Sequence, residues 1–264
     1  MGPLGSPDVS VDVVEVDQSI AAVPHVIDDA HAVLTYAGEL RVKVAGGDHV
    51  RVEVAPGLRR AALHLTLTGP VLGLVMTQRD HLVLHASAVA LPSGRVAVLI
   101  GSSGAGKSSI AAAACAAGAH LVADDLVPIP TSGAPTTHAG YPMVKLFPEV
   151  ARRLAAPAFE GDRLEGGKIA ADLRDRFAAG AHRVTTVYVL TAGHAAIVEP
   201  LSPGRALTAL VEGTYVHHLL RTAHGRAAHF QTLASLIDTV RVATLVTGDA
   251  GVEAAVEALL RDAG

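Results

Sequence analysis

Hydrophobic and polar residues alternate in short runs over the first ninety positions. VSVDVVEV, from Val9, carries valine at alternate positions, and LRVKVAGGDHVRVEV contains two such runs around a Gly-Gly-Asp centre. A period of two is typical of half-buried strands, and glycines between two such runs indicate a hairpin. LHLTLT continues the strand pattern until Gly69-Pro70 interrupts it, and VLGLVMTQR then predicts a short apolar helix. Residues 7–80 are therefore predicted to form a β-rich N-terminal subdomain packed on the core.

The middle of the chain changes from alternating to continuous apolar runs. HLVLHASAVAL is expected to be a strand, and RVAVLI is apolar enough for a strand buried on both faces. A glycine-rich stretch follows at once, then the alanine-rich helix SSIAAAACAAGA, then the strand HLVADDLVPI. This order of strand, loop, helix and strand predicts the centre of a nucleotide-binding α/β sheet within residues 81–264.

The remaining pattern completes an α/β unit. Residues 128–180 are rich in proline, glycine and charge, which predicts loops and short helices around a site. RVTTVYVL and VRVATLV are expected to be strands, and GVEAAVEALLRDAG is expected to be a closing helix. Two further helices are predicted from LTALVEGTYVHHLLR and RAAHFQTLASLIDTV.

Composition narrows the class of protein. The chain has 264 residues, half of them hydrophobic, and a formal net charge of -4, which does not favour a nucleic-acid partner. No uninterrupted apolar run is long enough to span a bilayer, so no membrane partner is expected. The single cysteine, Cys115, excludes an internal disulfide, and a cytoplasmic location is expected. Residues 1–6, MGPLGS, match the remnant of a cleaved affinity tag and take no part in the fold prediction.

The glycine-rich stretch fits the phosphate-loop pattern G-x-x-x-x-G-K-[ST] at every fixed position. Its glycines let backbone N–H groups approach phosphate oxygens, and the following helix directs its positive end toward them. The lysine adds a full charge at the β- and γ-phosphates, and the first serine after it is a ligand for Mg²⁺. The predicted phosphate-binding residues are Gly101, Ser102, Ser103, Gly104, Ala105, Gly106, Lys107, Ser108 and Ser109.

Two adjacent acids, Asp124 and Asp125, stand in the apolar strand after the phosphate-loop helix. One such carboxylate can support a metal, and its neighbour can take a proton from an acceptor hydroxyl. An ordinary turn or helix-capping role is the alternative. Paired carboxylates between apolar residues are costly unless they meet a cation or a substrate, which favours a functional role. The chain contains neither the Asn-Lys-x-Asp motif of GTPases nor the Leu-Ser-Gly-Gly signature of transporter ATPases.

LHASAVAL, GSSGAGKSS and GAHLVADDLVPI, in this order, resemble the catalytic domain of HPr serine kinase/phosphorylase and its kinase-like relatives. The resemblance implies a P-loop kinase core of the type shared with phosphoenolpyruvate carboxykinases, and a homo-oligomer. GYPMVKLFP, the Gly-Gly-Lys ending at Lys168, VTTVYVL and GTYVHHLL resemble a smaller branch among kinases of lasso-peptide and other peptide-tailoring clusters.

The resemblance also implies roles for individual residues. Asp125 would be the base beside the acceptor hydroxyl, Asp124 would support Mg²⁺ or the base, and His85 would adjust their protonation; Lys107 completes the predicted catalytic set. The glycine- and arginine-rich signature of the bifunctional enzymes is not recognisable after the Asp-Asp strand. This departure argues against a phosphorylase reaction and against HPr as the substrate.

Several further residues have two possible interpretations, an ordinary solvated surface position or a role in the site. Lys145 and Lys168 lie in Pro/Gly-rich segments, where lysines are usually solvated, but phosphoryl transfer needs cations around the moving group. Arg163 is a weaker candidate. The histidine-rich helix expected over 215–230 is interpreted as a packing or subunit-interface element, because adjacent helical histidines point in different directions.

Together these observations predict a kinase that uses ATP (or GTP) and Mg²⁺ to phosphorylate a serine-type hydroxyl. A precursor peptide is the first candidate acceptor, because of the branch resemblance. Free serine, another small alcohol or a carrier protein are alternatives. A second alternative is a regulatory module that senses a nucleotide without turnover, although binding alone does not need a base such as Asp125.

Overall fold

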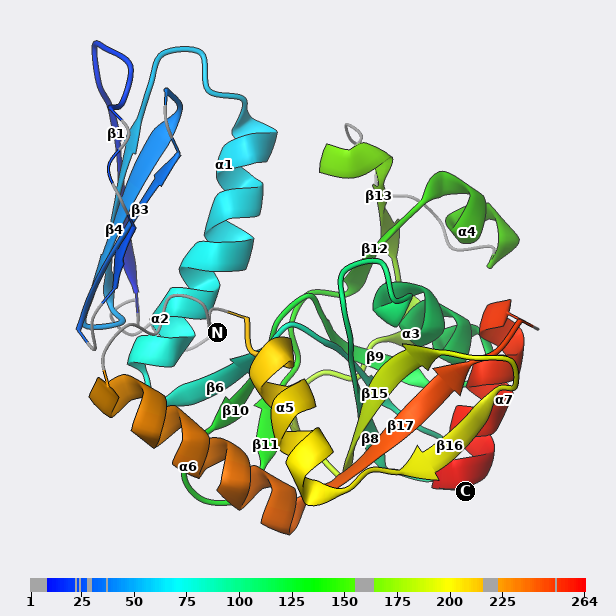
Figure 1. Ribbon diagram of the computed structural model, residues 1–264. Coiled ribbons are helices and arrows are strands. Elements are labelled where there is room, and N and C mark those ends of the chain that lie inside the picture. The colour runs from blue at the N-terminus through cyan, green and yellow to red at the C-terminus, as the bar shows by residue number, and fades with distance from the viewer. Residues whose placement is uncertain are drawn as a thin grey trace, which may run out of the picture. The chain divides into compact units, whose positions relative to one another are not determined.

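The computed structural model describes residues 9–21, 23, 25–27, 30–36, 38–154, 164–215, 223–249 and 251–264, and it has a mixed α/β fold (Figure 1). The chain divides into two compact units, here called the first and second unit. The first comprises Met1–Leu82 and Val216–His229, and the second Val83–Tyr215 and Phe230–Gly264. Two elements, β6 (His81–Leu84) and α6 (Ala223–Thr239), contain residues of both units.

Within its described residues, the first unit contains a five-stranded sheet in the order β1-β5-β4-β3-β2. The strands are β1 (Ser10–Glu15), β2 (Val26–Ile27), β3 (His31–Tyr36), β4 (Leu40–Ala45) and β5 (His49–Val54). All neighbours are antiparallel except β1, which runs parallel to β5. The predicted hairpin is confirmed, because Gly46 and Gly47 turn the chain from β4 to β5 with φ angles of 61° and 71°.

The LHLTLT segment is helical, so the prediction of a strand there was wrong. The structure has α1 (Arg60–Thr66), a π-helical turn η1 (Leu67–Val71) and α2 (Leu72–Gln78) in succession. The wider turn accommodates Pro70, which has no N–H to donate. The hydroxyls of Thr66 and Thr68 donate to carbonyl oxygens four residues earlier, so these strand-favouring residues are satisfied in the helix.

This continuous helical segment also bears on the expectation that no part of the chain is long and apolar enough to span a bilayer. Among the described residues, Arg60–Gln78 alone has the length and mean hydropathy that a membrane-crossing helix needs. Of the most apolar 18-residue window of this segment, 28% is buried. The expectation overlooked the segment because Gly69-Pro70 was taken as a break between a strand and a helix.

Within its described residues, the second unit is built on a six-stranded sheet in the order β16-β17-β15-β8-β7-β9. The strands are β7 (Ser87–Ala90), β8 (Val96–Ile100), β9 (His120–Asp124), β15 (Thr186–Ala192), β16 (Ile197–Pro200) and β17 (Arg241–Thr247). The central strands β8, β15 and β17 are parallel, whereas β7 runs antiparallel to both β8 and β9. Every residue of β8 is buried, as its apolar run predicted.

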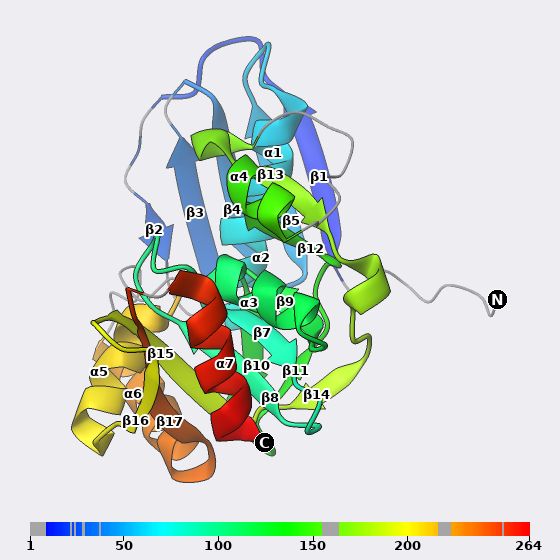
Figure 2. The same cartoon turned by 90° about the vertical axis from the view of Figure 1, so that its right-hand side faces the viewer.

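Helices cover both faces of this sheet. The helices α3 (Lys107–Ala116) and α7 (Gly251–Ala263) lie side by side (Figure 2) and share an apolar core with Ala97 and Leu99 of β8. Ile100 points to the opposite face. There it meets Gly213 at the end of α5 (Pro203–Gly213), where an added Cβ would lie 3.3 Å from the isoleucine Cδ1. The helix predicted through residue 221 ends here, and residues 216–222 lie outside the described part of the chain.

The stretch predicted as loops and short helices also contains strands. They are β11 (Thr136–His138), β12 (Met143–Leu146) and β13 (Ile169–Asp172). The strand β10 (Val127–Pro130) continues the predicted strand HLVADDLVPI, and β14 (Ala181–Arg183) follows directly after the stretch. The helical pieces are α4 (Pro148–Arg153), η2 (Glu165–Gly167) and η3 (Arg174–Arg176). β12 pairs antiparallel with β13, and β11 with β14. The strands β11, β12 and β13 have only three or four residues, too few to create a recognisable alternation, which is why they were not predicted.

Candidate active site

The glycine-rich stretch forms a loop between the buried strand β8 and helix α3. Gly104 and Gly106 have φ angles of 84° and 94°, a region that L-residues with a Cβ rarely adopt. Gly101 is restricted by space as well, because an added Cβ would lie 3.2 Å from the side chains of Ala105 and Leu190. The glycines therefore let the loop fold tightly against the N-terminus of α3, where unpaired backbone N–H groups favour an anion.

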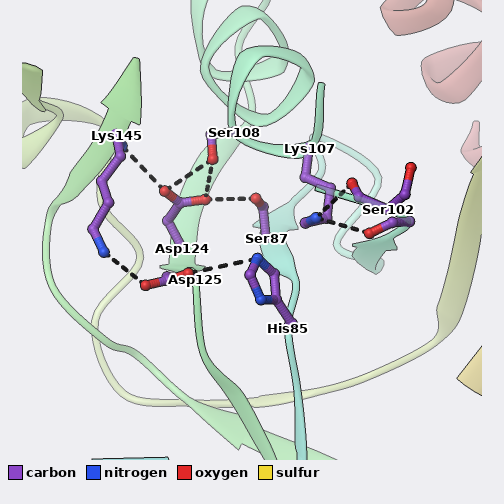
Figure 3. A network of polar contacts seen from close by, with 9 residues as sticks. His85, Ser87, Ser102, Lys107, Ser108, Asp124, Asp125 and Lys145 are labelled. Carbon is purple, nitrogen blue, oxygen red and sulfur yellow. Dashed lines mark hydrogen bonds and ion pairs between the residues drawn. The ribbon is translucent and has the colours of Figure 1, made fainter. Parts of the chain in front are cut away.

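Lys107 is the first residue of α3, and its side chain folds back over the loop. Its ammonium donates to the carbonyl oxygens of Gly101 at 2.8 Å and Ser102 at 3.2 Å (Figure 3). The residue is only 7% exposed, and this burial lowers the pKa of the ammonium. Both carbonyl partners of the ammonium are neutral, so its charge has no hydrogen-bonded anion among the described residues.

Asp124 ends β9 and accepts hydrogen bonds from three different elements (Figure 3). Ser87 Oγ of β7 donates to Oδ1 at 2.6 Å, and Ser108 Oγ of α3 donates at 2.9 and 3.1 Å to the two carboxylate oxygens. The backbone N–H of Lys145 donates to Oδ2 at 3.2 Å. Burial raises the pKa of this carboxyl group, and the hydrogen bonds oppose that rise only in part.

The oxygen atoms of Asp124 and its neighbour Ser108 are suitable ligands for a magnesium ion. Ser108 and Asp124 offer hydroxyl and carboxylate oxygens, the hard ligands that Mg²⁺ prefers. Among the described residues no group of three or more His, Cys, Asp or Glu side chains could hold a metal by itself. Mg²⁺ usually takes one or two protein oxygens and completes its shell with water and substrate phosphates.

Asp125 interrupts the strand predicted over HLVADDLVPI. Its φ angle is 77°, a strained conformation for a residue with a side chain, and it separates β9 from β10. The turn directs its carboxylate away from that of Asp124 and toward Lys145 Nζ, at 2.7 Å, and His85 Nε2, at 3.6 Å (Figure 3). The two adjacent aspartates therefore face different partners.

His85 lies between β6 and β7, where the predicted strand HLVLHASAVAL is interrupted. Its ring stacks on Tyr215 with centroids 5.4 Å apart, and its backbone N–H donates to the Gly213 carbonyl at 2.8 Å. Burial lowers the pKa of the imidazole, and the nearby charge of Lys107 lowers it further. His85 is therefore neutral near pH 7, and its 3.6 Å separation from Asp125 exceeds hydrogen-bonding distance.

These groups line one pocket of about 100 Å³. Its walls are His85, Ser103, Gly104, Gly106, Lys107, Ser108, Ser109, Asp124, Asp125, Lys145, Phe147 and Lys168. Every predicted catalytic residue and both candidate lysines are therefore brought together, whereas Gly101, Ser102 and Ala105 shape the loop without lining the pocket. Lys168 Nζ lies 5.4 Å from the centroid of the Phe147 ring. Arg163, His217 and His218 lie outside the described residues.

Three residues of the site were not predicted from sequence. Ser87 contacts Asp124 only because β7 and β9 pair with these two residues opposite each other. Phe147 belongs to the site because it lines the pocket, and Tyr215 because its ring stacks on His85. The GYPMVKLFP and GTYVHHLL segments were noted for their resemblance, but nothing in their spacing distinguishes these aromatic residues from surface or core positions.

No model of a known protein family matches the sequence, and no curated protein matches it. Among solved structures, the fold is similar to the HPr(Ser) kinase/phosphatase from Coxiella burnetii. The similarity extends over 68% of this chain and 94% of that chain, with 16% sequence identity and a TM-score of 0.38. It does not bear on the narrower resemblance to peptide-tailoring kinases. Because identity and TM-score are both low, any function for this chain has to be argued from its own pocket.

Proposed function

We propose that this chain is a kinase that transfers the γ-phosphate of ATP to an alcohol. The observation that carries the proposal is the shared pocket, in which Lys107 and Ser108 of the phosphate loop face Asp124 and Asp125. A phosphate loop alone would suit many nucleotide-binding proteins. A second carboxylate beside it, already oriented by Lys145 and not engaged by Ser108, suits a reaction in which an acceptor loses a proton.

The phosphate loop and Lys107 would bind the triphosphate. The lysine ammonium has only to exchange two carbonyl contacts for phosphate oxygens, and a charged donor makes stronger hydrogen bonds to an anion than to a neutral carbonyl. Ser108 and Asp124 would hold Mg²⁺, which neutralises charge on the phosphates when it is bound. GTP is the alternative nucleotide.

Asp125 would act as the base in the transfer step. The acceptor oxygen forms a bond to the γ-phosphorus while the bond from that phosphorus to the bridging oxygen of ADP breaks. The proton of the acceptor hydroxyl passes to the Asp125 carboxylate and from there to solvent. Lys145 holds this carboxylate at 2.7 Å and, with Lys168 on the same pocket wall, supplies positive charge around the transferred group.

The acceptor we propose first is a serine hydroxyl on a precursor peptide, which rests on the resemblance to peptide-tailoring kinases. Free serine, another small alcohol and a carrier protein are the competing acceptors. The proposal assigns no reverse phosphorylase activity to the chain, because the signature segment of the bifunctional enzymes is not recognisable in its sequence.

The experiment that tests the proposal incubates the protein with ATP, Mg²⁺ and each acceptor class, and measures the mass gain of one phosphate. Asp125→Asn should lose about a hundredfold to ten-thousandfold in transfer rate, because it removes the base. It should keep nucleotide affinity, because the phosphate loop is untouched. Transfer at the unaltered rate would refute the role of Asp125. Nucleotide binding without transfer to any acceptor would favour a sensing module instead.

A further inference from the structure

Ser87 is a buried hydroxyl behind the pocket for which the transfer reaction has no direct use. It is 1% exposed, and it does not belong to the pocket wall. The chain on either side of it is buried as well, since Ala86 and Ala88 are fully buried alanines. A hydroxyl in such a place costs free energy unless it has a partner. Its partner is Asp124 Oδ1, at 2.6 Å.

We infer that Ser87 is a positioning residue that fixes the Asp124 carboxylate in the orientation needed to bind the divalent cation of the nucleotide. The inference rests on the metal–nucleotide part of the proposed function and not on the identity of the acceptor. Of the three donors to Asp124, Ser87 makes the shortest contact, 2.6 Å against 2.9 Å for Ser108 and 3.2 Å for the Lys145 amide.

The three donors differ in how far their positions depend on what the pocket holds, and this difference supports the role of Ser87. The Ser108 oxygen is itself a predicted ligand of the cation, so its position depends on what is bound. The Lys145 amide belongs to β12, which pairs with β13 rather than with the central sheet. Ser87 belongs to the central sheet, where it is the direct cross-strand partner of Asp124. It is therefore the donor whose position depends least on the occupant of the pocket.

The backbone register preserves this pairing. The register between β7 and β9 shifts between Ala88 and Val89. After this shift, Ser87 stands opposite Asp124 at the end of β9. β7 also pairs with β8, the strand that leads into the phosphate loop. One strand thus links the carboxylate to the loop that binds the phosphates. Removing a group that orients a metal ligand typically weakens metal binding by about tenfold to a hundredfold.

The test measures metal binding directly, with Mn²⁺ as the probe. Free Mn²⁺ is followed by electron paramagnetic resonance while it is titrated into protein saturated with ADP, and binding of ADP is measured separately in EDTA. Ser87→Ala should weaken Mn²⁺ binding by about tenfold or more. ADP binding in EDTA should change by less than about twofold, because the phosphate loop and Lys107 remain.

Two further variants make the result specific. Ser87→Cys has nearly the same shape and a weaker donor, so its Mn²⁺ affinity should fall between those of the unaltered protein and Ser87→Ala. Thr244→Val removes a buried hydroxyl from β17 of the same sheet and should leave Mn²⁺ affinity unchanged. If Ser87→Ala does not fold, the Cys variant alone decides, since an affinity equal to that of the unaltered protein would overturn the inference.

The outcomes separate this inference from the proposed function. Equal Mn²⁺ affinities in all variants, with normal ADP binding, would overturn the role of Ser87 and leave the kinase proposal standing. An equal loss of ADP binding in EDTA would also overturn it, because Ser87 would then support the loop as a whole. Failure of the unaltered protein to bind ADP or Mn²⁺ would overturn both.

Discussion

Two aspartates of the second unit, Asp124 and Asp262, lie in polar clusters of opposite character. Asp262 of α7 accepts from both terminal nitrogens of Arg241, with the Nη2–Oδ1 pair at 3.0 Å, and from the Tyr188 hydroxyl at 2.7 Å. Among the described residues, Asp124 accepts from two serine hydroxyls and one backbone N–H. Both carboxylates are hydrogen-bonded from several elements, but within the described part of the chain only Asp262 is paired with a cationic side chain.

The pKa values shift in opposite directions for this reason. The hydrogen bonds of Arg241 lower the pKa of Asp262. Burial raises the pKa of Asp124, and no ammonium or guanidinium of the described residues is hydrogen-bonded to it to oppose this rise. The Asp262 cluster is therefore complete as it stands and joins α7 to β15 and β17. The Asp124 cluster would be completed by a cation from outside the chain, which is what the proposed metal–nucleotide site requires.

The largest expected difference between the two clusters concerns catalysis. Asp124→Asn should reduce phosphate transfer by about a hundredfold or more, because it removes charge from the metal site. Asp262→Asn should leave the rate within about twofold, because it lies outside the pocket. Steady-state rates at saturating ATP and Mg²⁺ measure both. Comparable losses in the two variants would erase the functional distinction between the clusters.

The same pair of variants should separate in stability without ligands. Asp124→Asn removes a buried charge that has no cation, so it should raise the melting temperature by about 2–4 °C, which corresponds to about 1 kcal/mol. Asp262→Asn weakens a charged hydrogen-bond network and should lower it. Differential scanning calorimetry in EDTA measures both changes. A lower melting temperature for Asp124→Asn would show that its serine contacts already compensate the burial of the charge.

Lys107 and Arg241 extend the comparison to cations. Lys107→Met should weaken ATP binding by about tenfold to a hundredfold, the effect of losing a charged hydrogen-bond donor of about 1.5–3 kcal/mol. Arg241→Met should leave the affinity unchanged, because its guanidinium is already paired with Asp262. Calorimetric titration with a non-hydrolysable ATP analogue distinguishes them. An unchanged ATP affinity in Lys107→Met would refute the role of this lysine in phosphate binding.

Asp262 also predicts a dependence of stability on pH. Its pKa is lower in the folded than in the unfolded chain, so the carboxylate stabilises the fold above its unfolded pKa of about 4 and loses this contribution as pH falls through the folded pKa. Asp262→Ala should therefore cost about 2 kcal/mol at pH 7 and less at pH 3. Urea denaturation at both pH values measures the difference. A cost that does not depend on pH would indicate lost packing instead of lost charge.

The smallest effect is expected at Tyr188. Its hydroxyl donates to Asp262, and burial raises the pKa of the phenol, so the group remains a neutral donor at ordinary pH. Tyr188→Phe removes one hydrogen bond and should cost about 1 kcal/mol, while Arg241 keeps the carboxylate paired. Thermal denaturation of the single and double variants with Arg241→Met measures the coupling. Strict additivity would show that the two donors act independently.

The parts of the site that sequence could predict are those encoded in contiguous residues. The glycine-rich loop and the Asp-Asp pair could be picked out because each is a contiguous motif of particular residue types, and the structure places both on one pocket. The contact between Ser87 and Asp124 depends on strand pairing between residues 37 positions apart. The strained turn at Asp125 is not predicted by any local sequence pattern.

The fold was predictable to a similar degree. The buried strand β8, the alanine-rich helix α3 and the hairpin of β4 and β5 follow from strong local patterns. The helix of residues 60–78 was predicted correctly over α2 (Leu72–Gln78) but missed over residues 60–68, because threonines and a Gly-Pro pair suggested a strand and a break. Side-chain hydrogen bonds to the backbone and a π-helical turn, neither visible in a pattern of polarity, allow the helix to continue.

The most direct test of the central claim is to locate a divalent cation in crystals grown with ADP and Mn²⁺. Anomalous scattering identifies the metal without any assumption about the reaction. We expect an anomalous peak between the Ser108 hydroxyl and the Asp124 carboxylate, next to the phosphates of ADP, and none at Asp262. Bound ADP with no peak beside Asp124, or a peak only elsewhere, would contradict the conclusion that this carboxylate is built to receive an external cation.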